Sequence, residues 1–115
     1  MFPQSDYIYT IWGYDPTSIF AGGEGGALFY YHDPLSGWEN RPPGVKNDVR
    51  SLFGPDGALL HASGSDGLVM HIGSPHSDWI VRSPPMCKGT LYGLWGRGSR
   101  DIFTVGAGGI VFHLQ

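Results

Sequence analysis

The chain has 115 residues, of which 41% are hydrophobic, so it is long enough for one domain with a buried core. Its formal net charge of −3 gives no basic surface for nucleic acid, and no apolar run is long enough to span a membrane, so neither is expected as a partner. The combination of 19 Gly and 9 Pro with 14% aromatic residues is typical of an all-β fold with many tight turns.

The first predicted strand spans Tyr9–Gly13, and a polar turn connects it to a second strand at Ser18–Gly22. A glycine-rich reversal at 23–26 leads to a third strand at Ala27–His32, because tight hairpin turns need the positive φ that glycine adopts at low cost. A longer turn precedes a fourth strand at Trp38–Pro42. No segment keeps a helical period over three turns, so we predict no helix.

This four-strand pattern recurs along the chain with a period of about 41–42 residues. Trp12, Phe53 and Trp95 occupy one position of the repeat, and Trp38 and Trp79 share another. Two sets of three glycines keep the same register. These glycines are Gly23, Gly64 and Gly106, and Gly26, Gly67 and Gly109.

Four short strands in a unit of this length are typical of a β-propeller blade, a small sheet that buries both faces against its neighbours. We therefore predict a single domain over residues 1–115 with three blades, at about 5–43, 44–84 and 85–115. The third blade stops before its fourth strand. Since propellers have about four to eight blades, two copies are expected to close a six-bladed ring as a homodimer. A fragment of a longer propeller is the alternative interpretation.

The amino terminus is the only segment left to complete the third blade. We expect Met1–Gln4 to run along the partner subunit near its residues 110–114 and to supply a short part of the missing strand. The first residues show no signal peptide, which favours a cytoplasmic location.

Residues 91–113 read Leu-Tyr-Gly-Leu-Trp-Gly at their start and Asp-Ile-Phe-Thr-Val-Gly-Ala-Gly-Gly-Ile-Val-Phe-His at their end. This pattern resembles the bacterial propeller repeats of the broad Asp-box and photosystem-assembly-factor-like group, and the resemblance covers nearly the whole chain. It implies a propeller of about 42 residues per blade. The chain departs from the family at the Asp box, since Ser65-Asp66-Gly67 lacks the tryptophan at the expected offset. The sialidase-type catalysis of some members is therefore not carried over.

Function on propellers is placed on the loops at the two ends of the ring. Tyr9, Arg50 and Tyr92 each lie three residues before the repeated aromatic position, and we expect them to enter the ring from one end. Glu24 and Asp66, in turns between second and third strands, share that end. Aromatic and arginine side chains around a mouth suit stacking on a sugar or capture of an anionic group. A structural role in the first strand is the alternative for the first three.

The repeated tryptophan and phenylalanine positions are expected to pack one blade on the next, with ligand stacking as the alternative. They are Trp12, Phe53 and Trp95 in the first strands, and Trp38 and Trp79 in the fourth.

The sequence contains no pattern of metal-binding or catalytic chemistry. His71 and His113 occupy equivalent positions on neighbouring third strands, which are rotated apart, so they are not expected to share a metal. Neither a nucleophile elbow, a phosphate-binding loop nor an HExxH motif is present. We expect no metal, no cofactor and no catalysis.

These observations favour a non-catalytic binding module that recognises a protein or peptide at one face of the ring. Lectin-like glycan binding at the ring mouth is the first alternative, and a glycan-processing enzyme is the second.

Overall fold

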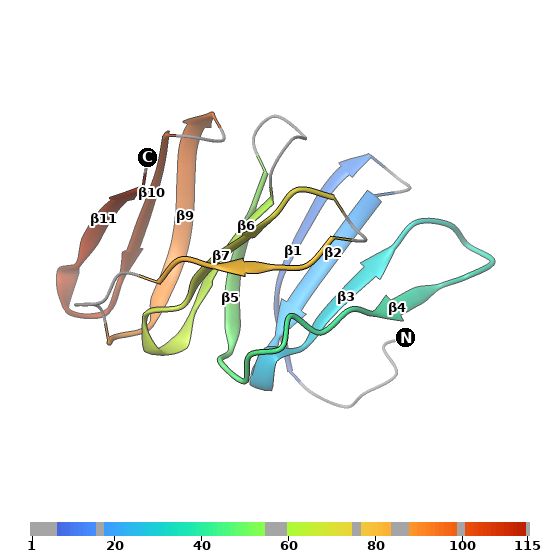
Figure 1. Cartoon of the computed structure of the whole chain (residues 1–115), viewed down its shortest axis with the longest axis horizontal. Coiled ribbons are helices and arrows are strands. Elements are labelled where there is room, and N and C mark those ends of the chain that lie inside the picture. The colour runs from blue at the N-terminus through green and yellow to red at the C-terminus, as the bar shows by residue number, and fades with distance from the viewer. Residues whose placement is uncertain are drawn as a thin grey trace.

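The computed structural model describes residues 7–15, 18–54, 60–74, 77–83, 88–98 and 101–114. It confirms the predicted all-β fold. The strands form three antiparallel sheets of four, four and three strands, and within each sheet every strand pairs with the next one along the chain. Figure 1 shows the sheets side by side, in sequence order from right to left. No helix in the described ranges is long and apolar enough to cross a membrane.

Each sheet is a meander of short strands. Sheet 1 contains β1 (Ile8–Asp15), β2 (Ser18–Gly23), β3 (Leu28–Tyr31) and β4 (Trp38–Asn40). Sheet 2 contains β5 (Val49–Phe53), β6 (Leu60–Gly64), β7 (Val69–Ile72) and β8 (Ile80–Val81). Sheet 3 contains β9 (Leu91–Gly98), β10 (Asp101–Gly106) and β11 (Val111–Leu114). The segment Met1–Gln4, predicted to extend a partner's third sheet, lies outside the described residues.

The three sheets share one turn between their second and third strands, a short 3₁₀ turn with a left-handed residue in the middle. These turns are η1 (Glu24–Gly26), η2 (Ser65–Gly67) and η3 (Ala107–Gly109). In each, the first backbone N–H donates to the carbonyl oxygen of the residue 17 positions earlier. The donors and acceptors are Glu24 and Tyr7, Ser65 and Asp48, and Ala107 and Thr90, at 2.9, 3.1 and 2.9 Å.

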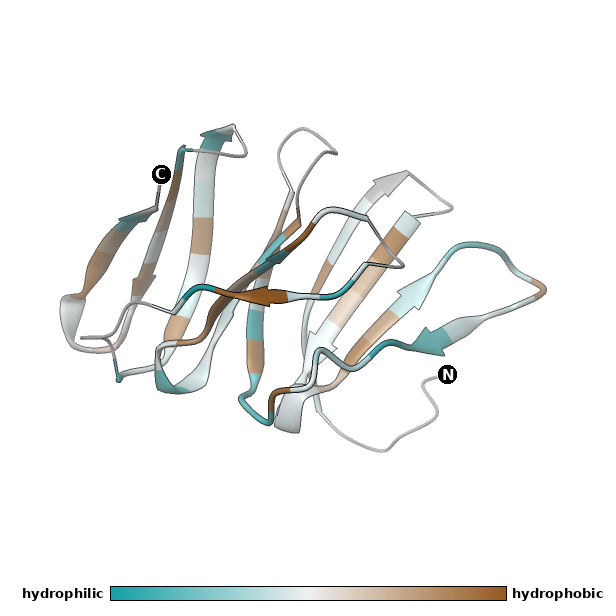
Figure 2. Ribbon diagram, in the orientation of Figure 1, coloured by the Kyte–Doolittle hydropathy of each residue, from teal (hydrophilic) through white to brown (hydrophobic). Residues whose placement is uncertain are grey.

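The sheets pack face to face, with the first strands β1, β5 and β9 in contact in series. The larger core lies between sheets 1 and 2, where Phe20 and Leu28 of one sheet meet Leu52 and Met70 of the other. A smaller cluster around Val69 and Leu91 joins sheets 2 and 3. Hydrophobic residues, brown in Figure 2, lie along strands of all three sheets, as expected where a sheet packs against a neighbour.

His71 on β7 is partly buried beside His61, whose ring centroid is 6.0 Å away. Burial lowers the pKa of His71 below its usual value of 6.5, and the nearby charge of Arg82 lowers it further. The unfolded chain therefore takes up a proton at a higher pH than the folded one. We expect the free energy of unfolding to fall as the pH drops below about 6.5. Urea unfolding at about pH 7.5 and pH 5.5 tests this, and His71→Gln should reduce the loss.

Candidate functional site

The first strands of the three sheets each contain a β-bulge at the same place. The pairing between β1 and β2 shifts between Ile8 and Thr10, and that between β5 and β6 shifts between Val49 and Ser51. In sheet 3 the shift lies between Val105 and Gly106, opposite Gly93 and Leu91 of β9. The residues left at the shifts are Tyr9, Arg50 and Tyr92. Because a bulge re-aims its side chain, the fold turns all three out of the regular alternation of their strands.

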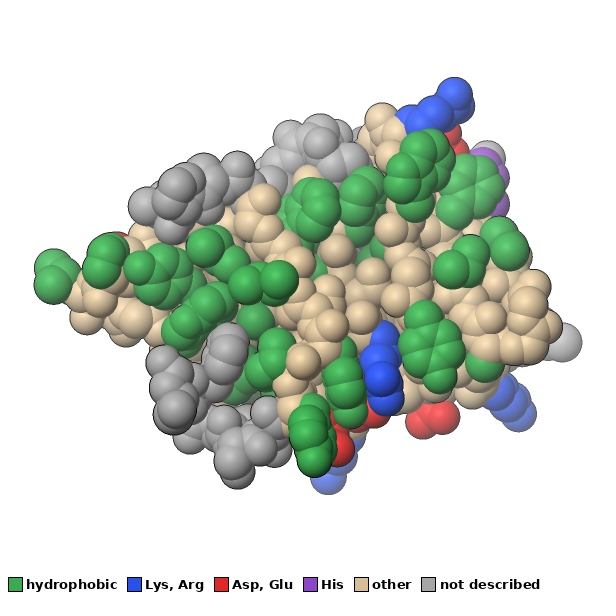
Figure 3. All heavy atoms as spheres, turned by 180° about the vertical axis from the view of Figure 1, so that it is seen from behind, with side chains coloured by type: hydrophobic (Ala, Val, Ile, Leu, Met, Phe, Trp, Pro, Cys, Tyr) green, Lys and Arg blue, Asp and Glu red, His purple; other side chains and the backbone are tan. Residues whose placement is uncertain are grey.

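The bulges bring these three side chains together in one row, which we call the Tyr–Arg–Tyr row. The guanidinium carbon of Arg50 lies 3.8 Å from the ring centroid of Tyr9 and 5.8 Å from that of Tyr92. Both tyrosines remain accessible, at 37% and 55% exposure. On the face opposite to that of Figure 1, Figure 3 shows a basic side chain (blue) between hydrophobic ones (green). Stacking on the rings holds the arginine in place and leaves the ring surfaces open to a ligand.

Asp48, two residues before the bulge, also belongs to this site. Its Oδ2 lies 3.6 Å from Nη2 of Arg50, and its Oδ1 accepts a hydrogen bond of 2.9 Å from the backbone N–H of Gly25 in sheet 1. The carboxylate therefore orients the arginine and ties sheet 2 to η1. Asp48 was not among the site residues predicted from the sequence. The equivalent positions in the other two repeats are Tyr7 and Thr90, which are uncharged. This departure from the repeat is the one sequence feature that could have indicated a role for Asp48.

Glu24 and Asp66, the two acidic candidates, are exposed residues of η1 and η2. Asp66 has a φ of 54°, the left-handed conformation that Gly25 and Gly108 adopt at the same place in their turns. Aspartate tolerates this conformation better than most residues do. The turn therefore explains why Asp66 occupies this position. Neither Glu24 nor Asp66 is among the charged partners of Arg50 in the described part of the chain.

The repeated aromatic residues occupy different environments. Trp12 meets Phe53 edge to face with centroids 5.2 Å apart, and both Trp12 and Trp79 pack against the core between sheets 1 and 2. Trp38 lies against Tyr31, with centroids 5.4 Å apart. Trp95 is 59% exposed, because sheet 3 has no neighbouring sheet on that side in the described part of the chain.

Among the described residues, no group of three or more His, Cys, Asp or Glu side chains is arranged to hold a metal ion. His71 and His113 have separate surroundings. His71 lies near His61, whereas His113 makes a hydrogen bond of 2.5 Å to Asp101 and stacks on Phe103. The Asp101 pKa lies below its usual value because of its hydrogen bonds to His113 and to Arg97.

No protein-family model matches this chain, and no curated protein or solved structure is significantly similar to it.

Proposed function

We propose that the chain is a non-catalytic binding module on a β-propeller scaffold, similar to the Asp-box and photosystem-assembly-factor-like repeats, and that it recognises a protein or peptide segment. The observation that carries the proposal is the Tyr–Arg–Tyr row, in which three bulges place a stacked arginine between two accessible tyrosine rings. Tyrosine and arginine are, with tryptophan, the residues enriched at the energetic centres of protein interfaces. Their stacking fixes the side chains before a partner arrives, which reduces the entropy lost on binding.

The charge of the row favours a peptide over a simple anion. Asp48 lies within 3.6 Å of the arginine and offsets its positive charge, so a phosphate or carboxylate gains little net attraction there. A peptide instead offers side chains that pack on the exposed faces of Tyr9 and Tyr92 and carbonyl oxygens that accept from the guanidinium.

We further infer that two copies close a six-bladed ring. Support comes from one face of sheet 3, which we call the free face: Trp95, Phe103, Val105, Val111 and His113. Val111 is 62% exposed, whereas the repeat-equivalent residues Val69 and Leu28 are 2% and 0% exposed beneath the next sheet.

On the outer face of sheet 1, the exposed apolar residue is Ile11, whereas its cross-strand neighbours Ala21 and Phe29 are already buried. Ile11 is 63% exposed, whereas its equivalent Leu52 in sheet 2 is 5% exposed against sheet 1. A second copy whose sheet 1 covers the free face would bury both surfaces in the way that sheets 1 and 2 already bury theirs.

The Tyr–Arg–Tyr row is tested by substituting its central residue. We expect Arg50→Ala to weaken binding to peptides selected from a displayed random library by at least about tenfold, as for an interface hot spot. The affinity of Arg50→Lys should lie between those of the wild type and Arg50→Ala, because lysine keeps the charge but loses the planar stack. Affinity is measured by titration calorimetry with the selected peptide.

Arg97→Ala is the matched control, since this arginine is 77% exposed and pairs with Asp101 on sheet 3, away from the row. Equal affinity of Arg50→Ala and Arg97→Ala for every selected peptide would contradict the proposed site.

A further inference from the structure

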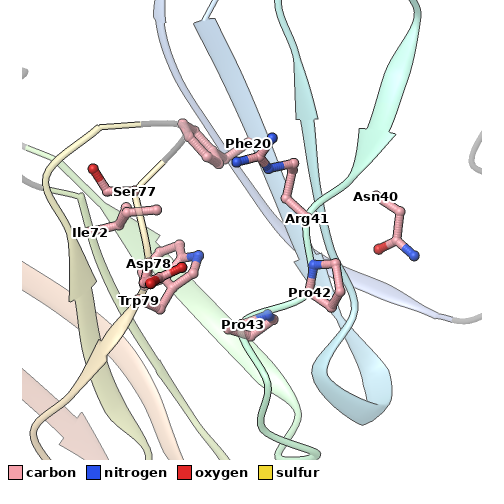
Figure 4. A pocket seen from close by; sticks show the side chains of 9 residues that line it. All are labelled: Phe20, Asn40, Arg41, Pro42, Pro43, Ile72, Ser77, Asp78 and Trp79. Carbon is pink, nitrogen blue, oxygen red and sulfur yellow. The ribbon is translucent and has the colours of Figure 1, made fainter.

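A cavity of about 350 Å³ lies between sheets 1 and 2, away from the Tyr–Arg–Tyr row. One wall comes from the turn before β8, with Ser77, Asp78 and Trp79, and the other from the segment after β4, with Arg41 and two prolines (Figure 4). Its volume is within the range of small-molecule sites. The full lining is Phe20, Asn40, Arg41, Pro42, Pro43, Ile72, Ser77, Asp78 and Trp79.

Rigid groups form the apolar part of this cavity. Trp79 is half-buried and packs against the core between the two sheets, which fixes its ring. Its indole Nε1 is buried and has no acceptor among the described residues, so the fold leaves one donor of this wall unpaired. On the opposite wall Pro42 and Pro43 have a restricted φ and add no backbone N–H. A ligand therefore meets a surface that is already arranged.

The polar part of the cavity offers both donors and acceptors with little net charge. Asp78 contributes carboxylate oxygens and Ser77 a hydroxyl, whereas Arg41 contributes guanidinium N–H groups. The arginine is balanced by Glu39, whose Oε2 lies 3.6 Å from its Nη1. A nucleotide or another polyanion finds no excess of positive charge here. A neutral ligand with many hydroxyl groups can both donate to the carboxylate and accept from the guanidinium.

Among the polar side chains of the cavity, Arg41 and Ser77 recur in the other repeat as Arg82 and Ser36. Asp78 and Asn40 do not recur. Asp78 corresponds to Gly37 in the first repeat, and Asn40 corresponds to Val81 in the second. Ser77 is held by a turn in which its hydroxyl lies 2.6 Å from that of Ser74. The carboxylate and the amide are therefore particular to this junction, whereas the arginine, the serine and the tryptophan belong to the repeated unit.

We propose that this cavity binds one pyranose unit of a neutral glycan. The apolar C–H face of the sugar packs on the Trp79 ring, and its hydroxyls exchange hydrogen bonds with Asp78 and Arg41. A proline-rich peptide fits less well, because such peptides dock between exposed aromatic ridges. Of the two aromatic residues that line the cavity, Phe20 is only 2% exposed. Trp79 therefore offers a single aromatic surface, where a proline-rich peptide needs two.

The test uses the full chain and a panel of methyl glycosides of neutral hexoses and N-acetylhexosamines, measured by saturation-transfer NMR and calorimetry. We expect at least one glycoside to bind, and Asp78→Ala and Trp79→Ala each to lower its affinity by about tenfold or more. Asp78 is exposed, so its replacement should leave the fold intact even where loss of Trp79 affects stability. Urea unfolding of both variants checks this.

Trp38→Ala and Glu24→Ala are the matched controls, since Trp38 is the repeat equivalent of Trp79 and neither residue lines the cavity. Both should bind the glycoside as the wild type does. The proposal is overturned if no glycoside in the panel binds, or if binding survives Asp78→Ala and Trp79→Ala. It is also overturned if Arg50→Ala abolishes sugar binding and the cavity variants do not, since the sugar site would then be the Tyr–Arg–Tyr row.

Discussion

Val111→Asp is expected to convert a dimer of about twice the 12.5 kDa chain mass into a monomer. Val111 is 62% exposed in the single chain, so the substitution adds a charge without disturbing the core of that chain. In a ring closed by two copies the same position is covered by the partner's sheet 1, and the carboxylate is buried without a counter-charge. Such a group costs about 3 kcal/mol or more, which is roughly a hundredfold in the dissociation constant.

Light scattering coupled to size-exclusion chromatography measures the change over a concentration series. Leu35→Asp is the control, because Leu35 is 99% exposed at the turn between β3 and β4 and is not part of the free face. This variant should remain dimeric. A wild-type chain that stays monomeric at every concentration would contradict closure by two copies, whatever the behaviour of Val111→Asp.

Ring closure also predicts how stability depends on concentration. An interface that covers a whole sheet on each side belongs to the obligate class, above about 2,000 Å² in total. Folding and association are then linked, so the thermal midpoint should rise with protein concentration.

The sequence could predict the all-β fold and the strand count of each sheet because the signals involved are periodic. Gly26 and Gly67 recur in register, and both have the positive φ that their turns require. The shortened third sheet follows from the same alignment, which ends before a counterpart of β4 or β8 is reached. These features are local, and each recurs in more than one repeat, so the sequence shows each of them several times.

The contacts within the candidate site could not be predicted so directly. Alignment places Tyr9, Arg50 and Tyr92 at one position of the repeat, but the bulges that turn them into one row depend on strand pairing. The cavity beside Trp79 depends on how two sheets meet, and no single repeat contains both of its walls. In both places, departures from the repeat, such as Asp48 and Asp78, are the sequence signal that remains.

The structure gives a physical reason for one set of repeated glycines. Gly23, Gly64 and Gly106 end the second strand of each sheet, where the first strand passes close by. A Cβ at these positions would lie 2.1, 1.7 and 2.2 Å from the backbone carbonyl oxygen of the residue that precedes that strand. Any side chain there forces the backbone apart.

Gly64→Ala is therefore expected to destabilise the protein by about 3 kcal/mol or more, with a loss of at least about 10 °C in Tm. The added Cβ would lie 1.7 Å from the carbonyl oxygen of Asp48, which is backbone and cannot rotate away. Gly64 has an extended φ of −175°, so the collision alone accounts for the loss. Gly98→Ala is the control, because nothing lies within 4 Å of its Cβ, and it should change stability by less than about 0.5 kcal/mol. Thermal unfolding at one protein concentration compares them, and equal midpoints for the two variants would contradict the close approach of these strands.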